Sequence, residues 1–350
     1  MRLLSTNSGP YRSFLRVSGL VLASALVLPL GACANSDSSA APQAVSSPEV
    51  ATALPAVTVG LTYIPNIQFA PAYAAVSEKN FGAQQVELRH HGQNEGLFNA
   101  LRSGQEDFVI AGADEAAVAA EQADDLLVVS PYYEQHPVEV LATKDSGIKS
   151  LSDLKGKRVG VPGRFGENWF GLLLALKSVG LAPEDVQIVE IGYTQRAAFT
   201  SGRVDALVGF KNNDAVQFQT LDLGATAIEI PTQGKLLGAS IITTKKYAQA
   251  NPASVRNVVK GFFKTYGDLA QDPNLAMQAS GAYIPDLNEK AISEAAKATW
   301  QATLPLLPQS ATCQNFGPTQ GTQMVEFLKS SGLITKPVDG ASLVTSEFCQ

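Results

Sequence analysis

The sequence predicts an α/β protein built from two lobes, preceded by an export signal and a linker. From Leu54 onward, short apolar runs alternate with amphipathic stretches of about ten to fifteen residues, which is typical of βαβ units in open parallel sheets. Roughly 300 residues follow the leader, more than one hydrophobic core usually holds. The segment 144–243 is itself a self-contained series of strands and helices. We therefore predict two lobes joined by two hinge crossover strands.

The predicted strands are short apolar runs bounded by polar or glycine-containing turns. They are Val57–Leu61, Gln85–Arg89, Phe108–Ala111, Leu126–Ser130, Val138–Ala142, Arg158–Val161, Gln187–Ile191, Ala206–Phe210 and Ala239–Thr243. Helical stretches lie between most of them. After Lys246 the chain is almost entirely helical, and Asn251-Pro252 predicts a helix start with proline in the first turn. The apolar residues that follow at helical spacing, Val255 to Tyr266, are expected in the core.

The N-terminal residues 1–32 have the organisation of a signal peptide. Arg2, Arg12 and Arg16 precede an apolar run, 17–30, which at about 14 residues is too short to span a membrane. The run ends in Leu-Gly-Ala-Cys33, which resembles the lipobox of bacterial lipoproteins. That resemblance implies that Cys33 carries a lipid and becomes the mature N-terminus. We predict a lipid-anchored protein on the extracytoplasmic face of the cell membrane.

Residues 33–53 are rich in Ser, Ala and Pro and have almost no large apolar side chains, so they predict a disordered tether. The signal carries three arginines and no acidic residues, so the formal net charge changes from −6 to −9 on processing. Nucleic-acid binding depends on Lys and Arg contacts to phosphate, and an acidic exported body argues against it.

The remaining cysteines, Cys313 and Cys349, lie in a compartment that permits disulfides. A metal site at these residues would have no supporting histidine nearby, so we predict a bridge between them.

The lobe limits follow from two places where an apolar strand is followed abruptly by polar sequence. The chain is predicted to leave lobe 1 near Thr143 and to return near Thr243, which gives residues 54–143 plus 244–350 as lobe 1 and 144–243 as lobe 2.

The stretch from Gly156 to Leu181 predicts one wall of a small-molecule site. An apolar strand passes through Pro162-Gly163-Arg164-Phe165-Gly166 into a helix with a wide apolar face. Glycines let the backbone approach a ligand, and a helix start has unpaired N–H groups. A structural turn with no ligand remains an alternative. Dinucleotide binding is disfavoured, because the glycine spacing departs from G-x-G-x-x-G and no ribose-binding acid follows.

Several segments together resemble the substrate-binding proteins of bacterial ABC importers. They are the strand-loop 59–66 (VGLTYIPN), the element 100–108 (ALRSGQEDF), the run 154–160 (LKGKRVG) and the element 201–207 (SGRVDAL). The match covers roughly 57–270 and is most similar to the group for thiamine-pyrimidine precursors, alkanesulfonates and nitrate. It implies a two-lobed periplasmic-binding-protein fold of type II, with ligand bound in the cleft between lobes.

The resemblance places the ligand beyond the carboxyl ends of the strands, where open α/β sheets bind small molecules. The predicted ligand-binding residues are those that the sequence places at these ends. They are Tyr63, Asn66, Gln68, Phe69, Asp114, Tyr132, Arg164, Phe165, Glu167, Asn168, Tyr193, Asn212 and Asn213. Paired amides after a strand have little packing value, so Asn212 and Asn213 are the first candidates, followed by Asn66 and Arg164. Asp114 is also expected to cap a helix.

This set is rich in aromatic rings and amides, which suits a planar nitrogen heterocycle held by stacking and edge pairing. The Tyr-x-Pro-Asn element is similar to the Trp-x-Pro-Asn of pyrimidine-precursor binders, and flavin-binding members of the group are a competing interpretation. An alkanesulfonate or nitrate binder is the alternative, although it would be expected to use hydroxyls and a compact cation.

An enzyme similar to the pyrimidine-precursor synthase is the remaining alternative class, but its cysteine-rich motif is missing from this sequence. His90 and His91 are adjacent on a strand and point to opposite faces, and His136 is isolated. Catalysis needs a nucleophile, a base and an orienting group together. We predict a binding protein with no catalytic residues, cofactor or metal. It would act as a monomer with an ABC permease and ATPase, although a signalling receptor would use the same cleft.

Overall fold

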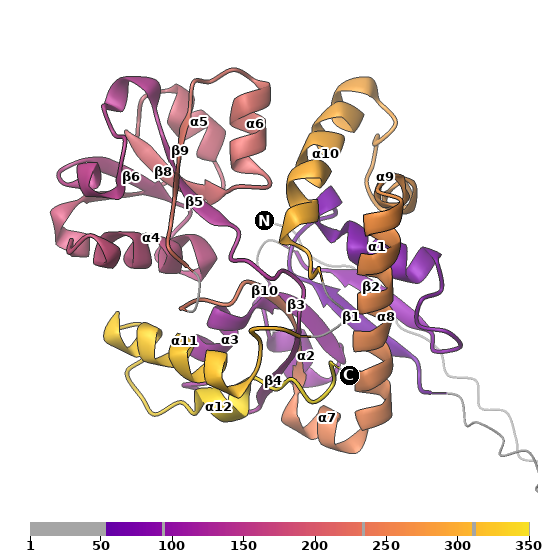
Figure 1. Ribbon diagram of the computed structural model, residues 1–350. Helices are drawn as coiled ribbons and strands as arrows, with labels where there is room; N and C mark the ends of the chain where they lie inside the picture. The colour runs from indigo at the N-terminus through magenta and orange to yellow at the C-terminus, as the bar shows by residue number, and fades with distance from the viewer. Residues whose placement is uncertain (1–53, 93–94, 233–234, 310–312, 350) are drawn as a thin grey trace, which may run out of the picture. The chain divides into compact units, whose positions relative to one another are not determined.

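The computed structural model describes residues 54–92, 95–232, 235–309 and 313–349 (Figure 1). The fold described here is that of the unit Thr52–Gln350. The predicted signal peptide (1–32), Cys33 and the tether (33–53) lie outside the described residues. Within the described ranges, no helix is both long and apolar enough to cross a membrane.

The first sheet has five strands in the order β2-β1-β3-β10-β4. These are β1 (Val57–Leu61), β2 (Val86–His90), β3 (Phe108–Gly112), β4 (Leu126–Pro131) and β10 (Ala239–Thr244). β1 pairs parallel with β2 and β3, whereas β10 runs antiparallel to both β3 and β4. The predicted parallel strands are therefore present, and one antiparallel strand is inserted among them.

The second sheet has the order β7-β6-β8-β5-β9 and repeats this arrangement. Its strands are β5 (Val138–Ala142), β6 (Arg158–Val161), β7 (Gln187–Glu190), β8 (Ala206–Phe210) and β9 (Thr226–Glu229). β6 pairs parallel with β7 and β8, and β5 runs antiparallel to β8 and β9. The edge strand β9 was not predicted, because its sequence TAIE lacks a sustained apolar run. The two similar five-stranded sheets confirm the predicted α/β class.

The predicted crossing points near Thr143 and Thr243 are wrong by one strand each. β5 is hydrogen-bonded in the second sheet and β10 in the first, so the chain crosses in the segments 132–137 and 230–238. A strand paired on both sides is buried whichever sheet holds it, so its apolar sequence does not identify its lobe. We propose residues 54–131 with 239–349 as lobe 1 and residues 138–229 as lobe 2 (Figure 1).

Lobe 1 carries most of the helices, which follow the strands and then form a long C-terminal series. They are α1 (Ala70–Ser77), α2 (Asn99–Ser103), α3 (Ala113–Ala119), α7 (Lys245–Ala250), α8 (Pro252–Gln271), α9 (Asn274–Ser280), α10 (Lys290–Thr303), α11 (Pro318–Ser330) and α12 (Gly340–Leu343), with 3-10 turns at Ile67–Phe69 and Leu304–Leu306. α8 begins at Pro252 as predicted. Its Val255, Val258, Phe262 and Tyr266 are buried against the first sheet, which confirms that this stripe is core.

Lobe 2 carries three α-helices, α4 (Gly166–Ser178), α5 (Gln195–Thr200) and α6 (Asp214–Thr220), with 3-10 turns at Lys144–Ser146, Leu151–Leu154 and Pro183–Asp185. α4 follows β6 as the glycine-rich stretch predicts, and its apolar face from Trp169 to Leu176 is buried. Gly166 starts this helix with φ +70°, in the left-handed region where glycine is favoured.

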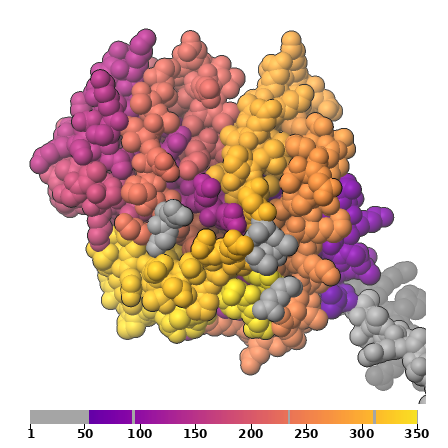
Figure 2. Space-filling view, in the orientation of Figure 1, coloured from indigo at the N-terminus to yellow at the C-terminus, as the bar shows by residue number. Residues whose placement is uncertain are grey.

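An apolar core runs through one side of the junction between the lobes. Val109 and Val128 of lobe 1 belong to the same buried cluster as Val138 and Leu172 of lobe 2. α11 extends this contact, because the Lys177 ammonium of α4 lies 5.7 Å from the Phe327 ring centroid. Figure 2 shows the C-terminal part of the chain, which contains α11 and α12, in yellow beneath lobe 2. The lobes are thus packed together on this side.

The sulfur atoms of Cys313 and Cys349 are joined in a disulfide, with 5.6 Å between the Cα atoms and 36 residues of separation. Cys349 is buried beside Phe348 in the lobe 1 core. The bridge therefore fastens the C-terminal end of the chain to the body.

We expect Cys313→Ser to lower the free energy of unfolding by about 3–4 kcal/mol, because opening a loop of this size restores entropy to the unfolded chain. Cys313 is the suitable site, since it is only partly buried and a serine hydroxyl there keeps access to water. Urea denaturation measures the change. A reductant should produce the same loss in the wild-type protein and none in the variant; a wild-type protein indifferent to reductant would contradict the prediction.

Candidate functional site

A cavity of about 240 Å³ lies between the two lobes, at the facing edges of the two sheets. Lobe 1 contributes the ends of β1, β3 and β4 and the start of β10, and lobe 2 contributes the ends of β6, β7 and β8. The lining residues are Thr62, Tyr63, Asn66, Gln68, Phe69, Leu97, Ile110, Ala111, Gly112, Glu115, Tyr132, Tyr133, Pro162, Phe165, Gly166, Glu167, Asn168, Tyr193, Gln195, Phe210, Asn213, Asp214 and Ala239. The cavity is therefore located where the carboxyl-end rule predicts a ligand.

Most of the residues predicted to bind ligand line this cavity. These are Tyr63, Asn66, Gln68, Phe69, Tyr132, Phe165, Glu167, Asn168, Tyr193 and Asn213. Asp114, Arg164 and Asn212 do not line it. Both lobes contribute, so a molecule in this cavity would touch both.

Exposed aromatic rings surround the mouth of the cavity. Tyr63 is 40% exposed on lobe 1, and Phe165 and Tyr193 are 59% and 56% exposed on lobe 2. The Tyr63 and Tyr193 rings approach edge to face with 6.1 Å between centroids, across the gap between lobes. Exposing such large apolar rings is unfavourable in water unless a partner covers them. The cavity therefore has exposed aromatic rings from both lobes at its mouth.

Two buried tyrosines form the floor. Tyr132 and Tyr133 follow β4, and their hydroxyl groups donate to the Gln68 carbonyl oxygen at 3.1 and 3.2 Å. These bonds fix the loop after β1 against the start of the first crossover. The Gln68 side chain has no hydrogen-bond partner among the described residues, so its amide is available to a ligand.

Each of the predicted asparagines that line the cavity also makes a hydrogen bond within the protein. Asn66 Oδ1 accepts from Gln68 N at 2.9 Å and caps a 3-10 turn. Asn168 Nδ2 donates to the Val208 carbonyl at 2.9 Å, which holds α4 against β8. Asn213 Oδ1 accepts from Gln217 Nε2 at 2.7 Å. These amides position the loops that line the cavity.

Three carboxyl groups face the cavity, of which Glu115 and Asp214 were not predicted. Burial, with the nearby Asp114 charge, raises the Glu115 pKa to about 8. Burial also raises the Glu167 pKa well above its usual range, with Asp114 and Glu115 adding like-charge repulsion. Burial raises the Asp214 pKa to about 6, although the Phe210 N–H donates to its Oδ2 at 2.8 Å. Among the described lining residues there is no lysine, arginine or histidine.

Asp114 is completely buried beside the cavity. Its Oδ2 lies 3.1 Å from His136 Nε2, and its Oδ1 accepts from Glu115 N at 2.8 Å. The expected capping role is wrong, because Gly112 is the N-cap of α3 and donates its N–H to Glu115 Oε2. His136 belongs to the first crossover, so this pair connects α3 to the hinge.

Arg164 and Asn212 are corrections to the predicted site. The Arg164 side chain is exposed, lies 5.3 Å from the Trp169 ring centroid and pairs with Glu190 at 3.3 Å. Asn212 is fully buried, and its Nδ2 donates to Thr303 Oγ1 on α10 at 3.1 Å. Asn212 thus forms a hydrogen bond between the lobes, outside the cavity. Asn212 and Asn213 are therefore in different places: Asn213 lines the cavity, whereas Asn212 does not. The residue type, which is the same for both, does not predict this difference.

His90 and His91 have different partners, as their adjacent positions imply. His90 Nε2 lies 3.0 Å from the Tyr73 hydroxyl and its Nδ1 lies 2.8 Å from the Tyr63 carbonyl oxygen. His91 is buried, with Nε2 2.9 Å from Glu106 Oε1. Neither histidine lines the cavity. His90 instead supports the loop that carries Tyr63.

Some unpredicted residues had a signal in the sequence. Glu115 and Asp214 are the immediate neighbours of Asp114 and Asn213, and Gln195 follows Tyr193 by two positions. Each lies in the first turn of a helix, close to a predicted residue; Asn213 and Tyr193 line the cavity as well, whereas Asp114 does not. Leu97, from the segment before α2, had no such signal.

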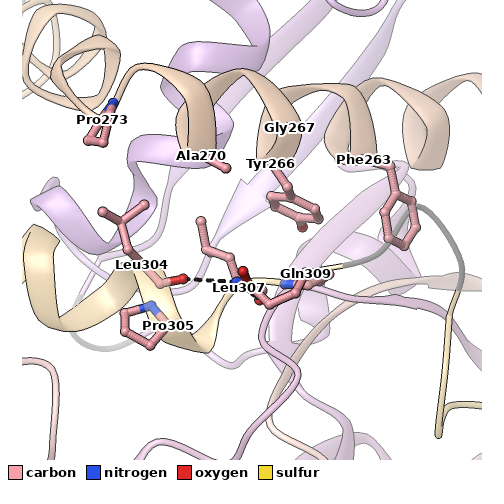
Figure 3. Close-up of a pocket in the computed structure, with 10 residues that line it drawn as sticks. Phe263, Tyr266, Gly267, Ala270, Pro273, Leu304, Pro305, Leu307 and Gln309 are labelled. Atoms are coloured by element: carbon pink, nitrogen blue, oxygen red, sulfur yellow. Dashed lines mark hydrogen bonds between the residues drawn. The ribbon is translucent and has the colours of Figure 1, made fainter.

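A larger cavity, of about 490 Å³, lies within lobe 1 between α8 and the segment 304–309. In Figure 3 Phe263 and Tyr266 project from α8 toward Leu307 and Gln309. Its lining is mainly apolar side chains and prolines, without a charged group, and lobe 2 contributes none of it. Of these two cavities in the described part of the chain, the one between the lobes combines aromatic faces, carboxyl groups and residues from both lobes, so it is the candidate binding site.

Comparison with known proteins places this site in a family context. The model of the family described as NMT1/THI5 like matches residues 66–276. Riboflavin-binding protein RibY of Chloroflexus aurantiacus is 30% identical over 341 residues, covering 94% of this chain and 97% of that protein. A Haemophilus influenzae protein named for thiamine biosynthesis is 30% identical over 207 residues, covering 56% of this chain and 61% of that one.

Among solved structures, the periplasmic aliphatic sulphonate binding protein SsuA of Escherichia coli matches with a TM-score of 0.67. It is 20% identical, and the match covers 83% of this chain and 91% of that chain. At that identity the likeness concerns the fold alone. It confirms the predicted two-lobed periplasmic-binding-protein fold.

The raised pKa of Asp214 predicts a pH-dependent stability difference between the wild-type protein and Asp214→Asn. Between its ordinary pKa of 3.8 and its folded value of about 6, only the folded state holds the proton. Stability therefore falls as pH rises through this range, by about 3 kcal/mol for this group. Asparagine can still accept from Phe210 N but does not ionise.

Urea denaturation of both proteins at about pH 4 and about pH 8 measures this effect. The variant should gain stability relative to the wild type at the higher pH. Parallel pH profiles for the two proteins would contradict the prediction.

Proposed function

This chain belongs to the NMT1/THI5-like family, and we propose that it is the solute-binding component of an ABC importer for a flat nitrogen heteroaromatic solute. The solute that we propose first is a flavin, bound through its isoalloxazine ring system. The relative named riboflavin-binding protein RibY, aligned over nearly all of both chains, supports this choice.

The observation that carries the proposal is the pair of aromatic surfaces at the mouth of the cavity. Tyr63 on one lobe and Phe165 and Tyr193 on the other are exposed and face the same space. A flat ring between them would be covered on both faces when the lobes close. Stacking of a base on an aromatic side chain contributes about 1–3 kcal/mol, and it depends little on which ring is bound.

Polar groups deeper in the cavity suit the edge of such a ring. A heterocycle presents both N–H donors and carbonyl or ring-nitrogen acceptors. The Gln68 amide offers both functions, and a carboxyl held neutral by burial, such as Glu115, can donate as well as accept. Because an unpaired buried polar group costs about 1–3 kcal/mol, these groups would fix the orientation of the solute.

The electrostatics disfavour an alkanesulfonate or nitrate as the solute. Glu115, Glu167 and Asp214 line the cavity, and the described lining contains no cationic side chain. An anion there would meet carboxyl groups instead of the lysine or arginine that pairs with sulfonate oxygens. The similarity to SsuA in fold does not transfer its ligand class.

A thiamine-pyrimidine precursor is the second candidate. The cavity volume of about 240 Å³ lies below the range of about 300–1,000 Å³ for drug-sized ligands, which favours a single ring. The Haemophilus influenzae relative named for thiamine biosynthesis supports it as well. A flavin would require the lobes to open beyond their present separation.

We propose binding rather than catalysis for this cavity. The described cysteines are joined to each other, and a sulfur in a disulfide is not available as a thiolate nucleophile. The carboxyl groups whose pKa is raised by burial suit hydrogen bonding to an uncharged ring. A turnover assay in which the protein chemically alters its solute would contradict this.

In the proposed mechanism, the lipid on Cys33 holds the monomer at the extracytoplasmic face of the membrane. The open cleft captures the solute, and the lobes rotate about the crossovers 132–137 and 230–238 to enclose it. The closed form then docks on the permease, and the ATPase drives release. Closure is favoured because only the closed form covers both faces of the ring.

Quenching of riboflavin fluorescence, or titration calorimetry, tests the proposal. We expect Tyr193→Ala to weaken riboflavin binding about tenfold or more, because it removes one stacking surface. Tyr283→Ala is the matched control, since Tyr283 stacks on Tyr73 in lobe 1 outside the cavity. That variant should keep wild-type affinity.

The same titration with the thiamine-pyrimidine precursor and with an alkanesulfonate separates the alternatives. If only the pyrimidine precursor binds tightly, the proposed solute is the pyrimidine precursor and not a flavin. Tight binding of the sulfonate, or equal affinity of Tyr193→Ala and wild type for every solute, would refute the proposed site.

A further inference from the structure

We propose that Asp114, His136 and Glu167 form a binding site for a divalent first-row metal ion, with Zn²⁺ as the fitting member, between the lobes. One ligand atom from each of the three side chains lies within 4.8 Å of the others. Two carboxylates and an imidazole are a ligand set that suits Zn²⁺. The inference does not depend on which solute the cavity binds.

The geometry of the three groups is that of a preformed set. Asp114 Oδ2 and His136 Nε2 are 3.1 Å apart, and both side chains are completely inaccessible to solvent. Adjacent ligands around a tetrahedral Zn²⁺ with bonds of about 2.0–2.2 Å are separated by a similar distance. The main-chain N–H of Glu115 donates to Asp114 Oδ1 at 2.8 Å, which orients the carboxylate.

An unpartnered carboxyl oxygen provides a second indication. Among the described residues, Glu167 Oε1 is buried without a hydrogen-bond partner. Glu167 as a residue is partly exposed to the cavity, but this oxygen is not accessible. A buried carboxylate oxygen without a donor is costly, and coordination of a cation would satisfy it.

The carboxyl groups of the cluster also lack a cationic side chain as partner. Asp114, Glu115 and Glu167 lie together, and in the parts of the chain that the structure describes no lysine or arginine comes within 4.0 Å of them. Buried carboxylates are stable when they are paired or coordinate a metal. A bound divalent cation would supply that partner and favour the ionised, ligating form of the carboxyl groups that hold it.

A second group, His91, Glu95 and Glu106, also has ligand atoms within 4.8 Å of one another. It differs because Arg89 already pairs with both carboxylates, at 2.6 Å to each. That cluster therefore has its own cation, and a metal ion would have to displace the guanidinium. It provides an internal control for the proposed site.

The three ligands come from three different parts of the fold. Asp114 is on α3 of lobe 1, His136 is in the first crossover and Glu167 is in the first turn of α4 of lobe 2. A metal ion held by all three would connect the lobes at the hinge and favour the closed form over the open one. Three protein ligands also leave a coordination position beside the cavity for water or a polar atom of the solute.

Titration calorimetry of the full chain with Zn²⁺ alone, after treatment with EDTA, tests the site. We expect about one Zn²⁺ per chain, with Asp114→Asn, His136→Gln and Glu167→Gln each weakening affinity tenfold or more. His91→Gln should keep the wild-type affinity and stoichiometry. Zn²⁺ should raise the melting temperature of the wild-type protein and of His91→Gln but not that of Glu167→Gln.

Failure of Zn²⁺ to bind the wild-type protein, or equal affinity for wild type and Glu167→Gln, would overturn the proposal. Asp114 and His136 are fully buried, so a variant at either position could fail to fold. Glu167 borders the cavity, and Glu167→Gln keeps the test decisive in that case. No organic solute is present in the titration. Its outcome is therefore separate from that of the riboflavin experiment, and either can fail alone.

Discussion

The direction of the first strand after each crossover determines the location of the candidate site. β5 follows the first crossover and β10 follows the second, and each is hydrogen-bonded on both sides inside its sheet. Both run antiparallel to their neighbours, so each begins at the edge where the parallel strands end. The register shows this, because Val138 lies opposite Phe210 and Ala239 lies opposite Gly112. The crossovers 132–137 and 230–238 can therefore pass directly between the two facing edges.

This connectivity also brings the crossovers together. A Cβ added to Gly238 would lie 3.0 Å from the Gln135 carbonyl oxygen, so glycine allows the two segments to touch. The core beside them is continuous from Val128 through Val138 to Leu172. Elsewhere the lobes meet through the Tyr63–Tyr193 ring pair, the packing of α10 near α6, and hydrogen bonds from Asn212 Nδ2 to Thr303 Oγ1 and Tyr133 Oη. Contacts of this kind can break and re-form at low cost, whereas an apolar core cannot.

The sequence predicted the fold and the loops of the site better than it predicted individual roles. Apolar periodicity identified almost every strand, but it could not assign β5 and β10 to a sheet, because both are buried in either arrangement. Loop position identified most of the segments that line the cavity, since strand ends follow from the pattern. Which side chain of a loop faces inward depends on local hydrogen bonds, such as the one that holds Asn168 to Val208 or Asn212 to Thr303. Those bonds join residues 40 and 91 positions apart, and no local pattern contains them.

The two sides of the cavity impose opposite conditions on a bound molecule. At the mouth, exposed Tyr63, Phe165 and Tyr193 favour an apolar surface that excludes water. At the back, Glu115 and Glu167 lie where burial penalises their ionised forms. A solute that is apolar on its faces and rich in hydrogen-bonding groups along its edge satisfies both conditions in one orientation, with the edge inward. An anion would meet carboxyl groups at the back, and an aliphatic chain would not stack on the rings at the mouth. We therefore propose a planar heterocycle as the class of solute.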